Sequence, residues 1–164
     1  MQLSRGVEWA THCCTILAMV PPGAGIPAEA LADFFGVPAA YLAKQLQALR
    51  RAGIVESSRG KRGGYRLARS VDAVSLLDIV HAVEGRTPAF RCTEIRRNGP
   101  CGLKPAECKR PCEIAHAFAD AEEAWRSALA GKLLAAIMAE AAQNSTPRHM
   151  LDIVDWVQAN GGAA

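Results

Sequence analysis

The stretch from residue 28 to residue 69 most constrains the fold, because it combines two short helical segments with a Gly-rich hairpin. The first segment, "AEALADFFGV", carries a terminating Gly36, and the second, "PAAYLAKQLQALRRAG", begins at Pro38 and ends at Gly53. Helices favour proline at the start and glycine at the end. Two short helices joined by a tight turn that contains glycine predict a helix-turn-helix.

The hairpin follows directly, in "IVESSRGKRGGYRLARS". Residues 54–56 and 65–67 are the strand candidates, and the glycines between them supply the positive φ angles of a tight tip. We therefore predict a two-stranded wing. In the second helix, we expect Leu42, Leu46 and Leu49 to face the core. The residues left for the outside are Tyr41, Lys44, Gln45, Gln47 and Ala48.

Basic residues are concentrated in the same region. Between residues 44 and 69 there are eight basic residues and one acid, a charge of +7 in a chain of net charge +3, which leaves −4 (3 minus 7) elsewhere. This asymmetry indicates a local anionic partner. We expect the second helix to enter the major groove of double-stranded DNA while the wing's cations meet phosphate. The candidate DNA-binding residues are Tyr41, Lys44, Gln45, Arg59, Lys61, Arg62 and Tyr65.

The remaining segments are helical apart from one loop. Apolar periodicity predicts helices over residues 3–20 and 75–85, a long one from Glu113 to about Ala142, and a last one over 149–158. Apolar residues at near-heptad steps suit the long helix to pairing with another helix. The expected fold is mainly α: a winged helix-turn-helix plus a long dimerisation helix. The expected divisions are a DNA-binding domain over 1–85, a cysteine-rich loop over 86–112, the dimerisation helix over 113–142 and a tail over 143–164.

The loop "RCTEIRRNGPCGLKPAECKRPC" holds four of the six cysteines and has neither helical nor strand periodicity. A secretory signal requires a continuous apolar segment near the N-terminus, and Glu8 and His12 interrupt the segment that would serve as one. No apolar run approaches membrane-spanning length. We therefore expect a cytoplasmic protein without a membrane partner, whose thiols stay reduced and serve metal or redox chemistry. Cys13 and Cys14 are adjacent in a helix, so we interpret both as small buried apolar residues.

Two kinds of metal site fit the loop. Its spacing, Cys-x8-Cys-x6-Cys-x3-Cys, lacks the Cys-x2-Cys pair that structural zinc prefers, yet zinc stays an alternative. An iron–sulfur cluster needs four donors. We find no nucleophile–base pair, phosphate-binding loop or carboxylate pair that would indicate an enzyme.

The motifs "YLAK", "L-x-x-AGIV", "RG-x-x-GGY-x-LAR" and "LLDIV-x-AVEG", followed by a cysteine loop, resemble the IscR/NsrR/RsrR family of bacterial winged-helix regulators over about residues 1–140. The resemblance implies a homodimer whose long helices pair and whose DNA binding is modulated by an iron–sulfur cluster. The commonest family pattern uses three loop cysteines about six residues apart and a fourth ligand of another type. Cys92, Cys101 and Cys108 would form that trio, although their spacing is longer.

A redox-responsive branch, typified by RsrR, is more similar. It shares "VEWA-x-HCC", "AF-x-CTEIR" and a cysteine just before "IA", here Cys112. This resemblance implies a 2Fe–2S cluster held by Cys92 and Cys112 of one subunit and by Glu8 and His12 of the other. Cys101 and Cys108 would then be free thiols or alternative ligands.

Residue spacing supports the first-helix pair, because Glu8 and His12 are four apart and project from one helix face. Cys112 precedes the long helix, whose dipole favours a thiolate. Trp9, next to Glu8, is a candidate redox-linked switch, although most such tryptophans belong to the core.

The expected function is a redox-sensing transcription regulator, most often a repressor in this family. A nitric-oxide-responsive 4Fe–4S regulator and a zinc- or thiol-based DNA-binding protein are the alternatives.

Overall fold

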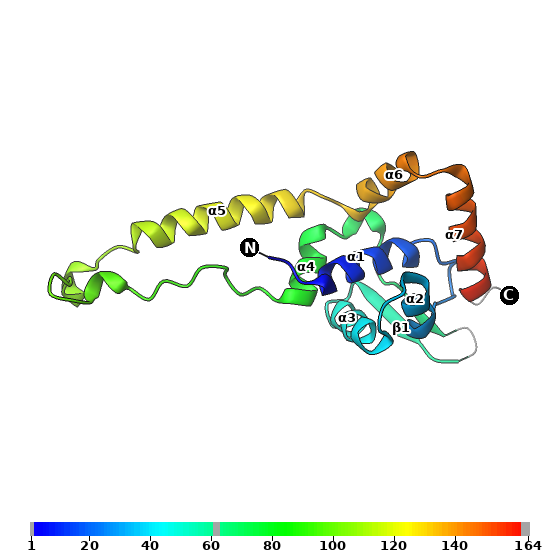
Figure 1. The fold of residues 1–164 in the computed structure, drawn as a ribbon, viewed down its shortest axis with the longest axis horizontal. Coiled ribbons are helices and arrows are strands. Elements are labelled where there is room, and N and C mark those ends of the chain that lie inside the picture. The colour runs from blue at the N-terminus through cyan, green and yellow to red at the C-terminus, as the bar shows by residue number, and fades with distance from the viewer. Residues whose placement is uncertain (1, 61–62, 162–164) are drawn as a thin grey trace.

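The computed structural model of the chain describes residues 2–60 and 63–161. Figure 1 shows a compact head and a long arm that projects from it. The elements are, in order, α1 (Arg5–Leu17), α2 (Ala28–Phe35), α3 (Ala39–Arg51), β1 (Val55–Ser58), β2 (Gly64–Leu67), η1 (Val71–Ala73), α4 (Leu76–Glu84), η2 (Ile95–Arg97), η3 (Pro105–Glu107), α5 (Glu113–Ala130), α6 (Leu134–Asn144) and α7 (Pro147–Asn160). The expected mainly α fold with a winged helix-turn-helix is confirmed.

The head consists of α1 to α4 and the wing, with α6 and α7 packed against it (Figure 1). Leu42, Leu46 and Leu49 of α3 are fully buried, as predicted. Cys13 and Cys14 of α1 are also buried, and burial raises the pKa of each thiol to about 12. This confirms their interpretation as core residues, since a thiol with such a pKa stays protonated.

The wing is tied to the head by a backbone contact. β1 and β2 pair antiparallel from Val55↔Leu67 to Ser58↔Gly64, and Ile26 exchanges two hydrogen bonds with Tyr65, at 2.9 and 2.8 Å. Gly64 lies at this crossing with φ 144°, and a Cβ there would come within 2.4 Å of the Ile26 carbonyl carbon. A residue with a side chain would therefore push the wing off the head.

The arm comprises residues 86–130. Its outgoing segment runs beside α5 (Figure 1). There Phe90 stacks on Phe118, with ring centroids 4.4 Å apart. The Ala89 N–H also donates to the Glu122 carboxylate at 3.1 Å. α5 has 18 residues and none of them is buried. At 1.5 Å per residue, α5 alone makes the arm about 27 Å long.

The single long helix predicted from Glu113 to about Ala142 is wrong, because two helices occupy that range. α5 ends at Ala130, and the chain then pairs with the segment before α4 through two hydrogen bonds, Leu76 N–H to Lys132 O at 2.9 Å and Leu134 N–H to Val74 O at 2.8 Å. These bonds return the chain to the head, and α6 begins there. Across residues 2–60 and 63–161, no helix is both long and apolar enough to span a membrane.

Candidate nucleic-acid interface and cluster site

The exposed face of α3 carries the predicted base-reading residues. Tyr41 is 64% exposed and Lys44 is exposed, whereas Gln45 is half-buried. Ala48, which we expected on the outside, is buried, so that prediction is wrong. Ala48 lies two positions after Leu46 and one before Leu49. The buried face of α3 is therefore wider than the face formed by the three leucines.

The wing supplies further candidates. Arg59 is exposed just after β1, while Tyr65 is half-buried and packs against the core. Lys61 and Arg62, also predicted to contact DNA, lie outside the described residues. Arg66 is engaged within the wing, where its Nε donates to Glu56 at 2.7 Å. Because Arg59 is exposed and Arg66 is already paired with Glu56, Arg59 is the better residue for testing whether the wing contacts phosphate.

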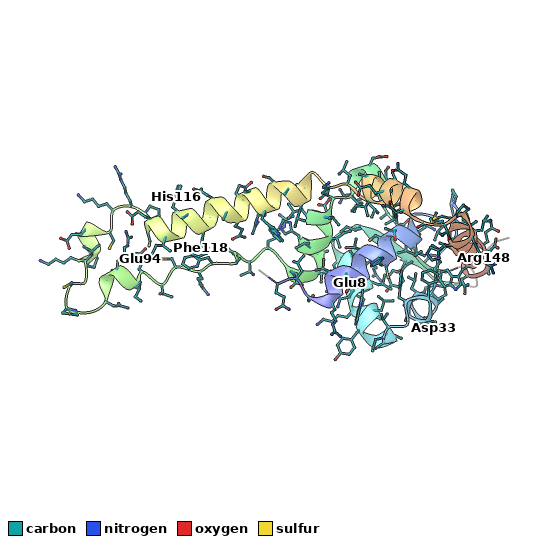
Figure 2. All side chains as sticks on the ribbon, turned by 45° about the horizontal axis from the view of Figure 1, so that its top comes forward. Glu8, Asp33, Glu94, His116, Phe118 and Arg148 are labelled. Atoms are coloured by element: carbon teal, nitrogen blue, oxygen red, sulfur yellow. The ribbon has the colours of Figure 1, made fainter. Side chains whose placement is uncertain are left out.

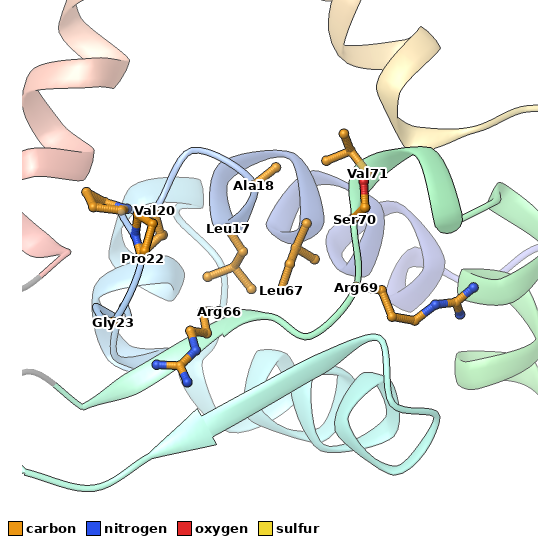
Figure 3. Close-up of a pocket in the computed structure, with 11 residues that line it drawn as sticks. Leu17, Ala18, Val20, Pro22, Gly23, Arg66, Leu67, Arg69, Ser70 and Val71 are labelled. Carbon is orange, nitrogen blue, oxygen red and sulfur yellow. The ribbon is translucent and has the colours of Figure 1, made fainter.

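An open hollow of about 480 Å³ lies beside the wing, bordered by Arg66 and Arg69 (Figure 3). Both guanidinium groups are already paired. Arg66 binds Glu56, and Arg69 lies 3.6 Å from Asp78 and donates to the Ala73 carbonyl. The positive charges of Arg66 and Arg69 are therefore largely compensated by Glu56 and Asp78, so the hollow is a poor site for an anion and we assign it no ligand.

Replacing Arg59 with alanine should weaken binding to all DNA sequences by a similar factor. If its guanidinium neutralises one phosphate, the slope of log K against log salt concentration should become shallower by about one. Titrations at several salt concentrations measure this slope. Arg59→Lys keeps the charge and should keep the wild-type slope, so an alanine variant with an unchanged slope removes Arg59 from the interface.

The tip of the arm brings together the first and last loop cysteines. Cys112 is 6% exposed and immediately precedes α5, while Cys92 is half-buried and lies close enough to interact electrostatically with Cys112. The Glu94 N–H donates to Cys92 Sγ at 3.4 Å. That N–H lowers the pKa of the Cys92 thiol, but partial burial, the Glu94 carboxyl and Cys112 raise it more, so the pKa lies above its ordinary value.

One arginine bridges the two ends of the loop. Arg96 pairs with Glu94 at 2.9 Å and with Glu113 at 3.3 Å, and it donates to the Arg110 carbonyl at 3.1 Å. Glu94 has φ 53°, unlike every other non-glycine residue of the described chain. Arg96 therefore links the Cys92 side of the loop to the start of α5. Sequence reasoning missed both residues, since a loop without periodicity gives no signal for such contacts.

Glu8 and His12 lie on the head, on the same exposed face of α1. Both line one open hollow of about 400 Å³, with Leu3 and Leu76. The His12 ring rests against Phe35, with centroids 5.8 Å apart. Trp9, between them in sequence, is half-buried and packs against the core.

The two pairs of predicted ligands are far apart within one chain. Figure 2 shows Glu8 on the head, while Glu94 and His116 lie on the outer part of the arm. Cys92 is two residues before Glu94 and Cys112 four before His116 in the sequence. Within residues 2–60 and 63–161, three or more metal-binding side chains nowhere gather as a group. Cys101 is exposed in the tip and Cys108 is half-buried. Within one chain, the predicted ligands Glu8 and His12 therefore do not lie together with Cys92 and Cys112.

Comparisons with known proteins agree with this fold. The sequence model of the Rrf2 family, described as an iron-dependent transcriptional regulator, matches residues 3–140. The HTH-type transcriptional repressor NsrR of Streptomyces coelicolor is 31% identical over 130 residues, which cover 79% of this chain and 82% of that protein.

Solved structures share the architecture. CymR, the global cysteine regulator of B. subtilis, has a TM-score of 0.62 at 23% identity and covers 85% of this chain and 98% of its own. IscR of T. potens has a TM-score of 0.64 at 20% identity, with 92% and 96% covered. At these identities the two structures show the fold alone. The family match over residues 3–140 and the 31% identity to NsrR show that the chain belongs to the Rrf2 family of winged-helix transcriptional regulators, proteins that act by binding DNA and not as enzymes.

Proposed function

We propose that this regulator is a redox sensor that works as a homodimer with a 2Fe–2S cluster at each arm tip. Cys92 and Cys112 of one subunit hold the cluster together with Glu8 and His12 of the other. The observation that carries this proposal is that the two predicted ligand pairs lie far apart within one chain, one on the head and one on the arm. A dimer that places one subunit's arm tip beside its partner's α1 joins them.

The donors present suit such a cluster. Cysteine thiolates are the usual ligands of iron–sulfur clusters, and imidazole replaces them where a higher reduction potential is needed. At the arm tip, the Glu94 N–H lowers the pKa of the Cys92 thiol, but partial burial, the Glu94 carboxyl and repulsion from Cys112 together raise it above its ordinary value. A bound cation relieves this repulsion, so the tip favours metal over two free thiolates.

The arm itself supports dimerisation. Ile114 and Phe118 of α5 are 60% and 51% exposed, and they lie one helical turn apart on one face with Ala121 and Trp125. Apart from the Phe90 ring on Phe118, this 18-residue helix with an apolar stripe and no buried residue has little of the packing that stabilises helices in water. A second α5 laid along this stripe supplies that packing.

Signal transfer follows from where the ligands sit. The cluster supplies a charge that changes by one electron between two states. Glu8 and His12 belong to α1, which packs within the DNA-binding head, so they tie the head of one subunit to the arm of the other. A change in how tightly they are held shifts α1, and with it Trp9, which lies against the core.

Metal analysis of anaerobically purified protein tests this function. We expect about two iron and two sulfide per chain and a visible spectrum that bleaches reversibly on reduction. About four iron per chain would instead identify a 4Fe–4S regulator of the nitric-oxide-responsive kind. Zinc without sulfide would identify a DNA-binding protein without a cluster, and either result contradicts the proposal.

A further inference from the structure

Gly6 of α1 lies directly under the side chain of Gln45 on α3. A Cβ built on Gly6 would come within 2.8 Å of Gln45 Cδ, 2.9 Å of Nε2 and 3.0 Å of Oε1. Because the three distances are nearly equal, the flat face of the carboxamide covers the position where a side chain would begin. Gly6 is itself buried by this contact, although it lies in the first turn of its helix.

This contact fixes the amide by its face and leaves its edges available. Among the residues that the structure describes, the Gln45 carboxamide has no hydrogen-bond partner. A glutamine that reads adenine does so with both edge atoms, accepting from N6 and donating to N7. A carboxamide held by its face is therefore already restrained in the way that such readout requires.

We propose that Gly6 is a positioning residue for base recognition, which seats Gln45 so that its amide edge faces adenine in the major groove. The methyl group of an alanine at position 6 would fill the space against which the Gln45 amide rests and would turn the amide away. The displaced atoms are the far end of a flexible side chain, so the fold should survive the change. Since helices tolerate alanine better than glycine, any loss of base preference would not reflect a weakened α1.

A double-mutant cycle tests the contact. The iron-free protein is used to select a duplex from random DNA, and each A·T pair of that duplex is then replaced in turn. Gln45→Ala should reduce the preference for one or two of these pairs by about 5- to 150-fold. Gly6→Ala should reduce the preference at the same pairs, and in the Gln45→Ala background it should have no further effect.

Gly131→Ala is the matched control, because a Cβ there meets only ordinary contacts of 3.6 and 3.7 Å. It should leave the preference unchanged. Thermal unfolding supplies a second readout, in which Gly6→Ala should stabilise the Gln45→Ala protein more than the wild type. Additive effects of the two substitutions on base preference and on melting temperature would overturn the proposal. So would an unchanged preference in Gln45→Ala.

The contact between Gly6 and Gln45 also connects the proposed cluster site to base recognition, and this consequence rests on the proposed function. Gly6 shares α1 with Glu8 and His12, and the Ser4 N–H before it is held by the Glu84 carboxylate at 3.0 Å. The adenine preference of the wild type should therefore differ between oxidised and reduced cluster, and this difference should vanish in Gly6→Ala. A difference that persists in Gly6→Ala contradicts the link. Protein that binds no cluster contradicts the proposed function instead, while the iron-free cycle still stands.

Discussion

Replacing Phe118 with aspartate should convert the protein to a monomer and abolish both operator binding and cluster binding. Phe118 is 51% exposed at the middle of the apolar stripe of α5, where the proposed partner helix lies. A carboxylate there would be desolvated against apolar side chains, and substitutions at such central positions commonly cost 2–4 kcal/mol, or about 30- to 1,000-fold in affinity. Sedimentation at micromolar concentration measures the change in mass.

Ala119→Asp is the control for this substitution. Ala119 is exposed on the same helix, but it lies about 100° further round, away from the stripe. It adds the same charge and should leave the dimer, the iron content and the DNA affinity close to wild type. A Phe118→Asp protein that stays dimeric with full iron would mean that α5 is not the dimer contact.

Local sequence signals predicted the head well and the arm only in part. Pro38, Gly36 and Gly53 mark the ends of helices through backbone chemistry that needs no tertiary context, and the structure places α2 and α3 accordingly. The break after Ala130 has a different origin. It depends on hydrogen bonds between residues 132–134 and 74–76, which are nearly 60 positions apart, and periodicity carries no record of them.

The candidate site divides in the same way. The i, i+4 spacing of Glu8 and His12 correctly placed both on one face of α1, and the identity of adjacent Cys13 and Cys14 as core residues followed from their position in a helix. The ion pairs of Arg96 and the contact between Gly6 and Gln45 could not be predicted from the sequence. Both join segments that meet only when the chain folds, and neither leaves a pattern of spacing.

Mixed dimers test the crossed arrangement of ligands most directly. One dimer pairs a chain carrying Glu8→Ala and His12→Ala with a chain carrying Cys92→Ala and Cys112→Ala. A second dimer pairs the wild-type chain with a chain that carries all four substitutions. Each is purified through two different affinity tags and reconstituted with iron and sulfide. The homodimers of each double variant serve as controls and should hold no stable cluster under either arrangement.

The iron content of the two mixed dimers separates the arrangements, because crossed and within-chain ligation predict opposite results. Crossed ligation leaves one complete site in the first dimer, formed by the first chain's cysteines with the second chain's Glu8 and His12, and none in the second dimer. We therefore expect half the wild-type iron in the first and none in the second. No iron in the first dimer and half in the second would contradict crossed ligation and place all four ligands within one chain.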